Sequence, residues 1–392
     1  MGAMSSPAPA ARASVLVLCF SPLDRDARVL RQIDTLAAAD FDVTTCGYGP
    51  APRQGIEHVR LPDGLTAWRL NRPLVIARQF RRAYWSQESV VAAWEALRGQ
   101  EFDVVLADDV ETVPLALALR PRAGVHADLH EYSPRLKEQL RPWRLFVAPY
   151  IRWICRSAVH AASSVTTVAE GLAREYEKDF GFSTGVLTNA APFQDREPTP
   201  VQGPIRMVHS GAAMPARQLE VMIDAVAELE QESPGRVVFD LYLTPNHPDY
   251  VTQLRHRAAS THGAVRVLDP VAHTELPATL ADYDVGLFAC PDTTFSLAHA
   301  LPNKFFDYVQ ARLAIAISPS PEMAQLLERH DLGVVSTQMS AASFADALRE
   351  LTPSEIYRYK SNAHRAAHAL SAEEEMPKLV RIIRQILDQG AR

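Results

Sequence analysis

The sequence has 392 residues, of which 47% are hydrophobic and 22% charged, with a net charge of -6 and a pI of about 6.1. These values are typical of a globular chain of two or three domains and give no basic footprint for nucleic acid. No apolar run reaches the roughly 18 residues that a membrane-spanning helix needs. We therefore expect no nucleic-acid partner and no membrane span.

The cysteines and the N-terminus indicate the compartment. The four cysteines lie far apart and form no C-x-x-C pair or zinc-ligand spacing: Cys19, Cys46, Cys155 and Cys290. Such thiols are expected to be reduced and mostly buried. The opening MGAMSSPAPAARA lacks the apolar core of a secretory signal peptide. We expect a cytoplasmic protein.

From Ser14 onward, short apolar runs alternate with helical patterns. SVLVLCF (14–20) is continuously apolar, as in a strand buried on both faces, and residues 26–39 repeat apolar side chains at helical spacing. Further strands are predicted at 42–48, 103–107, 125–129 and 164–169. This alternation predicts parallel strands joined by helical crossovers, and therefore an open α/β sheet.

A second series of the same kind follows a proline-rich segment, AAPFQDREPTPVQGP (190–204), which is predicted to be a linker. The series predicts a strand, an amphipathic helix and four more strands: 205–211, 218–231, 237–243, 264–268, 284–289 and 314–318. The predicted fold is α/β, with two Rossmann-like domains facing a central cleft. We draw the domains at 13–195 and 203–370, and expect the terminal segment 371–392, helical over 371–387, to pack back on the first domain.

Two stretches interleave arginine with aromatic and aliphatic residues: AWRLNRPLVIARQFRRAYW (67–85) and LRPWRLFVAPYIRWICR (140–156). One interpretation is an ordinary surface helix with its arginines in water. The other is a basic face that lies on an anionic membrane, as a peripheral contact at its inner side. Both interpretations stay open.

Several catalytic motifs are absent. Neither leading strand is followed by G-x-G-x-x-G, and no Walker A, G-x-S-x-G or H-E-x-x-H pattern occurs. The acid pair in DVE (109–111) is a weak metal signal, and we predict no metal site.

The polar residues at strand ends of the second series are more informative. Gly211 follows a strand and allows close backbone approach to a ligand, and Arg217 can pair with phosphate. In ALPNKFFDYV (300–309), Pro302 is expected in the first turn of a helix whose free amides and Lys304 would face an anion. The Asp307 carboxylate could accept hydrogen bonds from ribose hydroxyls. The alternative is a simple Lys304–Asp307 surface pair.

The order of these motifs resembles that of GT-B glycosyltransferases, specifically family 4-like enzymes (glycosyltransferase group 1). The resemblance is carried by VHSGAAMPARQLEVMIDAVAEL, ALPNKFFDYVQARLAIAIS and, in the first half, DARVLRQIDTLAAADFDVTTCGYG, DVVLADDVETVPLALAL and ADLHEYSP. It implies a nucleotide-sugar on the C-terminal domain and an acceptor on the N-terminal domain. By position it implies catalytic roles for His130, Arg217 and Lys304, and donor contacts from Gly211, Val271, His299, Leu301, Pro302, Asn303 and Asp307.

Two positions depart from the family pattern. Many relatives carry E-x7-E, whereas this chain has His299 and Asp307 at those positions, and its first loop lacks their glycines. Asp26 and Arg28 fit a D-x-R-V variant, although Arg28 could equally lie on a helix surface.

The resemblance implies a retaining, metal-independent hexosyltransferase that moves a sugar from a nucleotide-diphosphate sugar to an acceptor hydroxyl, in glycan, glycolipid or natural-product biosynthesis. It implies no cofactor besides the donor substrate, and it leaves the acceptor and the oligomeric state unknown. Two alternatives stay open: an enzyme like the nucleotide-sugar 2-epimerases, and a non-catalytic GT-B auxiliary subunit.

Overall fold

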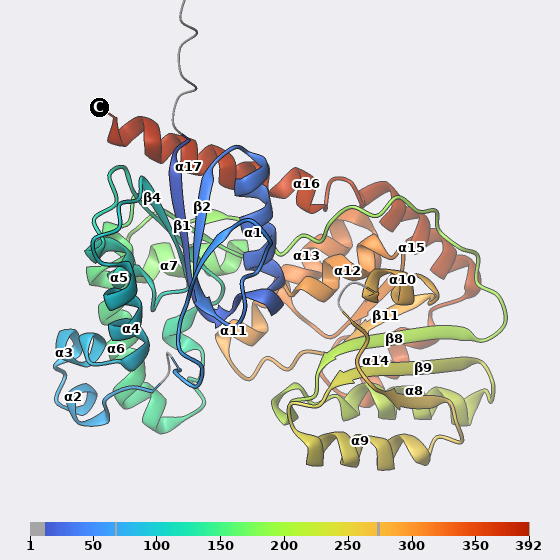
Figure 1. Cartoon of the computed structure of the whole chain (residues 1–392). Helices are drawn as coiled ribbons and strands as arrows, with labels where there is room; N and C mark the ends of the chain where they lie inside the picture. The colour runs from blue at the N-terminus through green and yellow to red at the C-terminus, as the bar shows by residue number, and fades with distance from the viewer. Residues whose placement is uncertain (1–11, 67–68, 273–274, 392) are drawn as a thin grey trace, which may run out of the picture.

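Two all-parallel sheets organise the chain, one in each half (Figure 1). The computed structural model describes residues 12–66, 69–272 and 275–391. The first sheet has the strand order β3-β2-β1-β4-β5-β6-β7, and the second has the order β10-β9-β8-β11-β12-β13. In both, the order reverses beside the first strand of the half, as in doubly wound sheets. The predicted α/β fold of two Rossmann-like units is confirmed.

The elements of the first half span residues 14–186. Its strands are β1 Ser14–Pro22, β2 Asp42–Tyr48, β3 Glu57–Arg60, β4 Val104–Asp108, β5 Gly124–Leu129, β6 Ser164–Thr167 and β7 Gly185–Val186. Its helices are α1 Ala27–Ala38, α2 Arg72–Ile76, α3 Phe80–Trp85, α4 Glu88–Leu97, α5 Val113–Ala118, α6 Ala148–Ser157 and α7 Glu170–Phe180. Single turns lie at η1 Leu23–Arg25, η2 Ser133–Arg135, η3 Trp143–Val147 and η4 Val159–Ala161.

The second sheet begins at residue 205. Its strands are β8 Ile205–Ala212, β9 Val237–Thr244, β10 Val265–Leu268, β11 Val285–Phe288, β12 Ala314–Ile317 and β13 Gly333–Val335. The helical segments after residue 212 are η5 Pro215–Arg217, α8 Glu220–Glu232, α9 Pro248–Ala259, α10 Leu276–Ala281, α11 Phe295–Ala298, α12 Asn303–Gln310, α13 Pro321–His330, α14 Ala341–Arg349, α15 Pro353–Ala366, α16 Ala372–Glu375 and α17 Pro377–Gly390.

The central strands form where the sequence is continuously apolar, because they are covered on both faces. The side chains of residues 15–18 in β1 have no exposed surface, and the strand pairs with both β2 and β4. The helix that follows begins where expected, because the Asp26 side chain accepts a hydrogen bond from the Val29 amide at 3.3 Å. The four cysteines are free and buried, as predicted.

The sequence prediction was wrong at the sheet edges and near the C-terminus. The edge strands β3, β7 and β13 were missed because they are short and only partly buried, which weakens the apolar pattern. The single helix predicted at 371–387 is two helices, α16 and α17. Pro377 has no amide hydrogen to continue the ladder, so the chain restarts its helix there.

The C-terminal helix returns to the first half (Figure 1). The α17 helix contacts β4, β5 and α1, with Leu379 and Ile383 fully buried in the core of the first half. Just before α16, Ser371 forms an isolated parallel β-bridge with Ala191, where the chain crosses between the halves. The exact domain limits given above stay a prediction.

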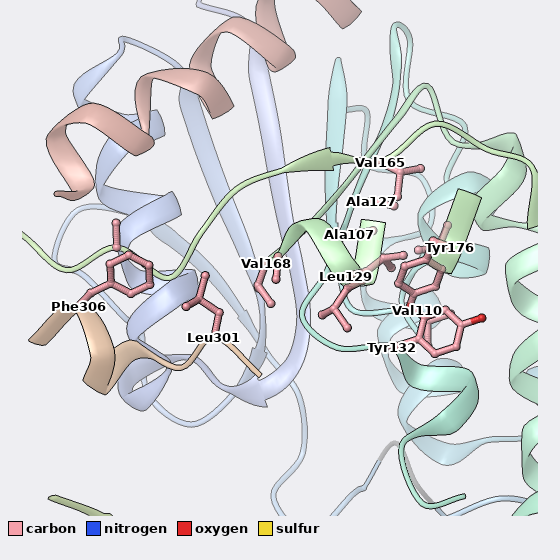
Figure 2. Close-up of a cluster of buried hydrophobic side chains, with 14 of the residues drawn as sticks. Ala107, Val110, Ala127, Leu129, Tyr132, Val165, Val168, Tyr176, Leu301 and Phe306 are labelled. Atoms are coloured by element: carbon pink, nitrogen blue, oxygen red, sulfur yellow. The ribbon is translucent and has the colours of Figure 1, made fainter. Parts of the chain in front are cut away.

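The two halves share one apolar core (Figure 2). Leu301 and Phe306 of the second half belong to the same cluster of buried side chains as Leu129 and Val168 of the first. Polar contacts add to this junction, because the Asn189 side-chain amide donates to the Leu301 carbonyl oxygen at 2.9 Å. The sheets are therefore packed together rather than only tethered by the linker. No helix in the described ranges combines the length and the apolar character needed to cross a membrane.

Candidate active site

A pocket of about 320 Å³ lies at the carboxyl ends of the strands of the second half. The end of β8 contributes Ser210 and Gly211, and Ala27 at the start of α1 approaches from the first half. The remaining lining residues are Tyr242, Thr244, Pro270, Val271, Leu276, Asn303, Lys304 and Asp307. Ligands of doubly wound sheets bind at this edge, so the pocket is the leading candidate for a donor site.

Lys304 is the central charge of this pocket. Its side chain is only 8% exposed, and its Nζ atom has no hydrogen-bond partner among the described residues. Nζ lies 4.7 Å from the centre of the Phe288 ring. Burial, and then the charge of Arg217, lowers the pKa of Lys304 from its ordinary 10.5 to about 7. A buried ammonium without a partner is costly, and an anion in the pocket would relieve that cost.

Gly211 allows the β8 loop to approach this lysine. Its φ is +153°, and a Cβ atom there would lie 2.7 Å from Lys304 Nζ. A side chain at position 211 would therefore fill the space in front of the ammonium. This supports the sequence interpretation of Gly211 as a place of close backbone approach.

Asp307 lies one turn further along α12 and meets a residue that the sequence analysis missed. Arg31 of α1 donates from Nη2 to the Asn303 Oδ1 atom at 2.7 Å, across the junction of the halves. Burial raises the pKa of Asp307 to about 6, against the charges of Arg31 and Lys304. Arg31 stood within a stretch quoted for the family resemblance, but nothing local distinguishes it from other helix arginines.

Pro302 occupies the N-cap of α12, one residue before the predicted first turn. Its φ of -79° and ψ of 158° are extended, and its carbonyl oxygen accepts from the Phe305 amide at 3.1 Å. The correction leaves the amides of Asn303 and Lys304 as the free donors at this helix end, since the Phe305 amide is already used. Fewer backbone amides than predicted are therefore free to bind an anion at this helix end.

Val271 lines the pocket, whereas Arg217 is not among its lining residues. Arg217 ends the turn η5, and its guanidinium has no hydrogen bond or ion pair with any described side chain. It is close enough to lower the pKa of Lys304, so the two cations share one electrostatic environment. Val271 lines the pocket beside Pro270 and Leu276, which makes an apolar wall of the kind that a base could contact. Residues 273–274 of the predicted base segment lie outside the described residues.

A second residue that the sequence analysis missed is His209, which is fully buried behind the pocket. Its Nδ1 atom lies 2.9 Å from the Leu287 carbonyl oxygen, so Nδ1 carries the hydrogen and donates it. Burial first, and then Lys304, holds the pKa of His209 well below its ordinary value. The neutral ring leaves Nε2 as an acceptor without a partner among the described atoms. The sequence signal for it was its place two residues before Gly211.

His299 and Leu301 do not line the pocket. The Nδ1 atom of His299 lies 2.9 Å from Glu322 Oε1, and its ring packs on Phe295 with centroids 4.3 Å apart. A Cβ on Gly171 of α7 would overlap with both His299 and Glu322. The pair is thus part of the contact between the halves. Leu301 is buried in the shared core.

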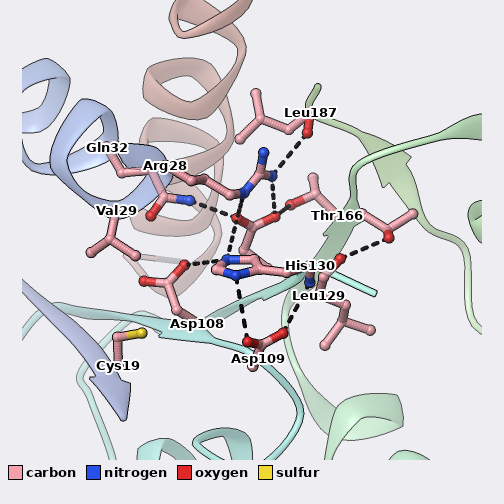
Figure 3. A network of polar contacts seen from close by, with 12 residues as sticks. Cys19, Arg28, Val29, Gln32, Asp108, Asp109, Leu129, His130, Thr166 and Leu187 are labelled. Carbon is pink, nitrogen blue, oxygen red and sulfur yellow. Dashed lines mark hydrogen bonds and ion pairs between the residues drawn. The ribbon is translucent and has the colours of Figure 1, made fainter. Parts of the chain in front are cut away.

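The first half holds a dense polar network at the ends of β4 and β5 (Figure 3), in which Asp128 accepts hydrogen bonds from three other residues. Arg28 donates to both Asp128 oxygens, with Nε–Oδ2 and Nη2–Oδ1 distances of 2.7 and 2.8 Å. Gln32 and Thr166 donate to the same carboxylate at 2.6 and 2.7 Å. Arg28 is only 3% exposed, so its interpretation as a helix-surface residue is wrong. Arg28 also donates to Leu187, Thr188 and Asn189, so its guanidinium is fully engaged within the protein.

His130 lies among three carboxylates of this network (Figure 3). Its Nε2 atom is 3.2 Å from Asp108 and 3.5 Å from Asp128, and Nδ1 is 3.4 Å from Asp109. Burial would lower the pKa of His130, but these carboxylates outweigh it and hold the pKa well above 6.5. Burial raises the pKa of Asp108 to about 7. The raised pKa favours the charged ring, which donates hydrogen bonds from both nitrogens.

The same cluster has the spacing of a metal site. Ligand atoms of Asp108, Asp128 and His130 lie within 4.8 Å of one another. The donor set does not fit a resident cation well, because the Asp128 carboxylate already accepts hydrogen bonds from Arg28, Gln32 and Thr166. Of the two acids in DVE (109–111), only Asp109 contacts His130, so the two do not come together in this cluster.

Comparisons with known proteins bear on the family and the fold of the chain. Residues 27–189 match the model of Glycosyltransferase Family 4. The search of curated proteins found no match. Among solved structures, sucrose-phosphate synthase from Thermosynechococcus elongatus is similar with a TM-score of 0.71 and 13% identity, over 96% of this chain and 100% of that chain.

Two further structures share this fold at the same low identity. An α,α-trehalose-phosphate synthase (UDP-forming) from Burkholderia vietnamiensis gives a TM-score of 0.70 at 13% identity, over 97% of this chain and 100% of that one. Anabaena Alr3699/HepE, in complex with UDP and glucose, gives 0.68 at 13%, over 95% and 100%. Residues 27–189 therefore match the family 4 model, and the chain as a whole has the GT-B fold of these solved structures.

Proposed function

We propose that the protein transfers a hexosyl group, with retention of configuration and without a metal, from a nucleotide-diphosphate sugar to an acceptor hydroxyl. The observation that carries the proposal is the buried Lys304 ammonium, which lines the pocket without a hydrogen-bond partner among the described residues. A diphosphate supplies the missing negative charge. Asp307 on the same helix is spaced to accept from a ribose.

The reaction breaks the bond between the anomeric carbon and the diphosphate oxygen, which keeps the electron pair. The acceptor oxygen forms its bond to the anomeric carbon on the same face, and its proton passes to the leaving phosphate. Lys304 and Arg217 stabilise the charge that develops on that phosphate, which is electrostatic catalysis by fixed cations. His130, as a charged donor, is proposed to hold a hydroxyl of the transferred sugar.

UDP-glucose is the first donor to test. One structural relative is described in complex with UDP-glucose and with UDP, and another is named as UDP-forming. We expect the pocket of this chain to take the same class of donor, with Val271 and Pro270 against the base.

The test is nucleotide release from a panel of UDP-, GDP- and dTDP-sugars, in the presence and absence of candidate acceptors. Wild type should release nucleotide from one donor, and Arg217→Ala and Lys304→Ala should each lose most of that activity. Arg329→Ala, an exposed arginine on α13 without an ion pair, serves as the control. Absence of donor binding in wild type would refute the proposal. Binding without turnover would favour the auxiliary subunit, and an epimerised sugar would favour the epimerase.

A further inference from the structure

The two arginine-rich stretches of the first half come together on one surface. A groove of about 830 Å³ is lined by residues of both. We call its six principal side chains the basic apolar face: Arg69, Arg72, Ile76, Lys137, Leu140 and Phe146. The stretches contact each other through α2 and η3. Residues 67–68, which belong to the first stretch, lie outside the described residues.

Apolar side chains are unusually exposed here. Seven large apolar side chains in the described part of the chain are prominently exposed; three of them belong to this face and a fourth, Leu145, lies beside it. Ile76 is 58% exposed and Leu145, beside the groove on η3, is 64% exposed; the others are Leu140 and Phe146. Contiguous exposed apolar surface of this kind marks a site of contact with another surface.

The charge around these side chains has a single sign. The sequence contains no Asp or Glu from Gly64 to Gln87 or from Gln139 to Ala169, although the whole chain has a net charge of -6. Four acids border these segments: Asp63 pairs with Arg60 and Glu138 with Arg135, each at 2.6 Å, and the other two are Glu88 and Glu170. Among the described residues, the five arginines at 69–82 and those at 141 and 144 form no ion pair with a carboxylate. The face is therefore both basic and apolar.

Topology puts this face at the same edge of the sheet as the network of His130. The segment that leads into α2 leaves the carboxyl end of β3, and the segment through η3 leaves the carboxyl end of β5, directly after His130. In Figure 1, α2 and α3 lie on the side of the first half away from the second half. A surface that covers the face would thus lie next to the N-terminal side of the candidate site without blocking the pocket of the second half.

The geometry points to a docking surface for a bilayer rich in anionic lipid headgroups. The arginines would meet the headgroup phosphates, while Ile76, Leu145 and Phe146 would enter the boundary between headgroups and acyl chains. A small ligand within the groove would leave Leu145 in water, because this residue lies outside the lining. A bilayer would cover both the groove and Leu145. The inference does not depend on donor or acceptor identity.

Co-sedimentation with vesicles tests this without any nucleotide-sugar. Wild type is expected to bind vesicles of phosphatidylglycerol and phosphatidylcholine, to bind phosphatidylcholine vesicles weakly, and to lose affinity as salt increases. The triple variant Arg69→Gln, Arg72→Gln, Arg144→Gln should bind about a hundredfold more weakly, since each basic residue near an anionic surface contributes roughly fivefold. The matched control is Arg381→Gln with Arg384→Gln, two exposed arginines on α17 at the far end of the same half.

A second pair of variants tests the apolar part. Ile76→Ser with Leu145→Ser should remove the binding that persists at high salt, and Tyr357→Ser, an exposed aromatic residue on α15, should not. Failure of wild type to bind anionic vesicles would overturn the inference. Equal weakening by the α17 control would also overturn it, because the attraction would then be general. So would a concentration-dependent dimer that the face variants abolish, since the face would be an interface between copies.

Discussion

Replacing Lys304 by methionine should stabilise the unliganded protein and abolish its stabilisation by a nucleoside diphosphate. The pKa of Lys304 falls from 10.5 to about 7 because of burial and then the charge of Arg217. One pKa unit corresponds to about 1.4 kcal/mol, so the buried ammonium lowers the free energy of unfolding by about 4 to 5 kcal/mol below pH 7. Methionine fills a similar volume without a charge, and its variant does not carry this cost.

The sign of the pH dependence follows from the same pKa. Between the folded pKa of about 7 and the ordinary value of 10.5, the unfolded chain binds the proton of Lys304 and the folded chain does not. The stability of wild type therefore rises with pH across this window as far as Lys304 is concerned. The advantage of Lys304→Met is accordingly largest below pH 7 and closes toward pH 10.

Urea unfolding midpoints at pH 6.5 and pH 9, with and without UDP, give the measurement. At a hundredfold excess over its Kd, UDP should stabilise wild type by about 2.7 kcal/mol and leave the variant unchanged. Lys360→Met is the matched control, because Lys360 is equally buried but donates to Asp284 at 3.0 Å and to Thr199 at 2.9 Å. That variant should lose stability at both pH values. A Lys304→Met protein that is less stable than wild type at pH 6.5, or still stabilised by UDP, would contradict the reasoning.

Two further predictions concern the first half and the junction. The first is that the stability difference between His130→Asn and wild type should change with pH. The stability that His130 contributes is fully present below pH 6.5 and is lost as pH rises through its raised pKa. In thermal melts, the loss of stability in the variant should therefore shrink between pH 6 and 9. A deficit independent of pH would argue against a charged His130. Gly171→Ala should force the His299–Glu322 pair away from α7, with a lower melting temperature and a larger radius of gyration by small-angle scattering; Glu170→Ala, at the exposed neighbouring position, should behave as wild type.

The features that the sequence could predict depend on neighbours in the chain. The corner at Lys304 was predictable because a proline, a lysine and an acid lie within six residues, so one helix end determines their arrangement. Even there the helix starts one residue later than expected, since Pro302 takes an extended conformation at the N-cap. The central strands were equally local, because a continuous apolar run has few alternatives to a buried strand.

The features that escaped prediction depend on partners far away in the chain. Arg28 could not be separated from a surface arginine, because its partner Asp128 is 100 residues away. Arg31 acquires a role only where α1 meets Asn303 in the other half. His299 was expected to face the donor, and its actual partner Glu322 lies on a helix that follows the next strand. Arg31 required the packing of the two halves to be known, whereas Arg28 and His299 required the fold of their own half.

The main buried cations of the two halves are partnered differently, and this difference suggests how the site works. In the first half, Arg28 donates to five atoms and both carboxylate oxygens of Asp128 accept hydrogen bonds, although Gln32 Oε1 and Asp108 Oδ2 beside them have no partner in the described structure. In the second half, the Lys304 ammonium itself has no partner among the described residues, and neither does His209 Nε2 behind it. A cation whose donors are all engaged gains little from an anionic ligand, whereas a buried cation without a partner gains the full desolvated interaction. Binding energy for the donor is therefore expected to come mainly from Lys304 and its surroundings, while the carboxylates of the first half hold His130 in position for the acceptor side of the reaction.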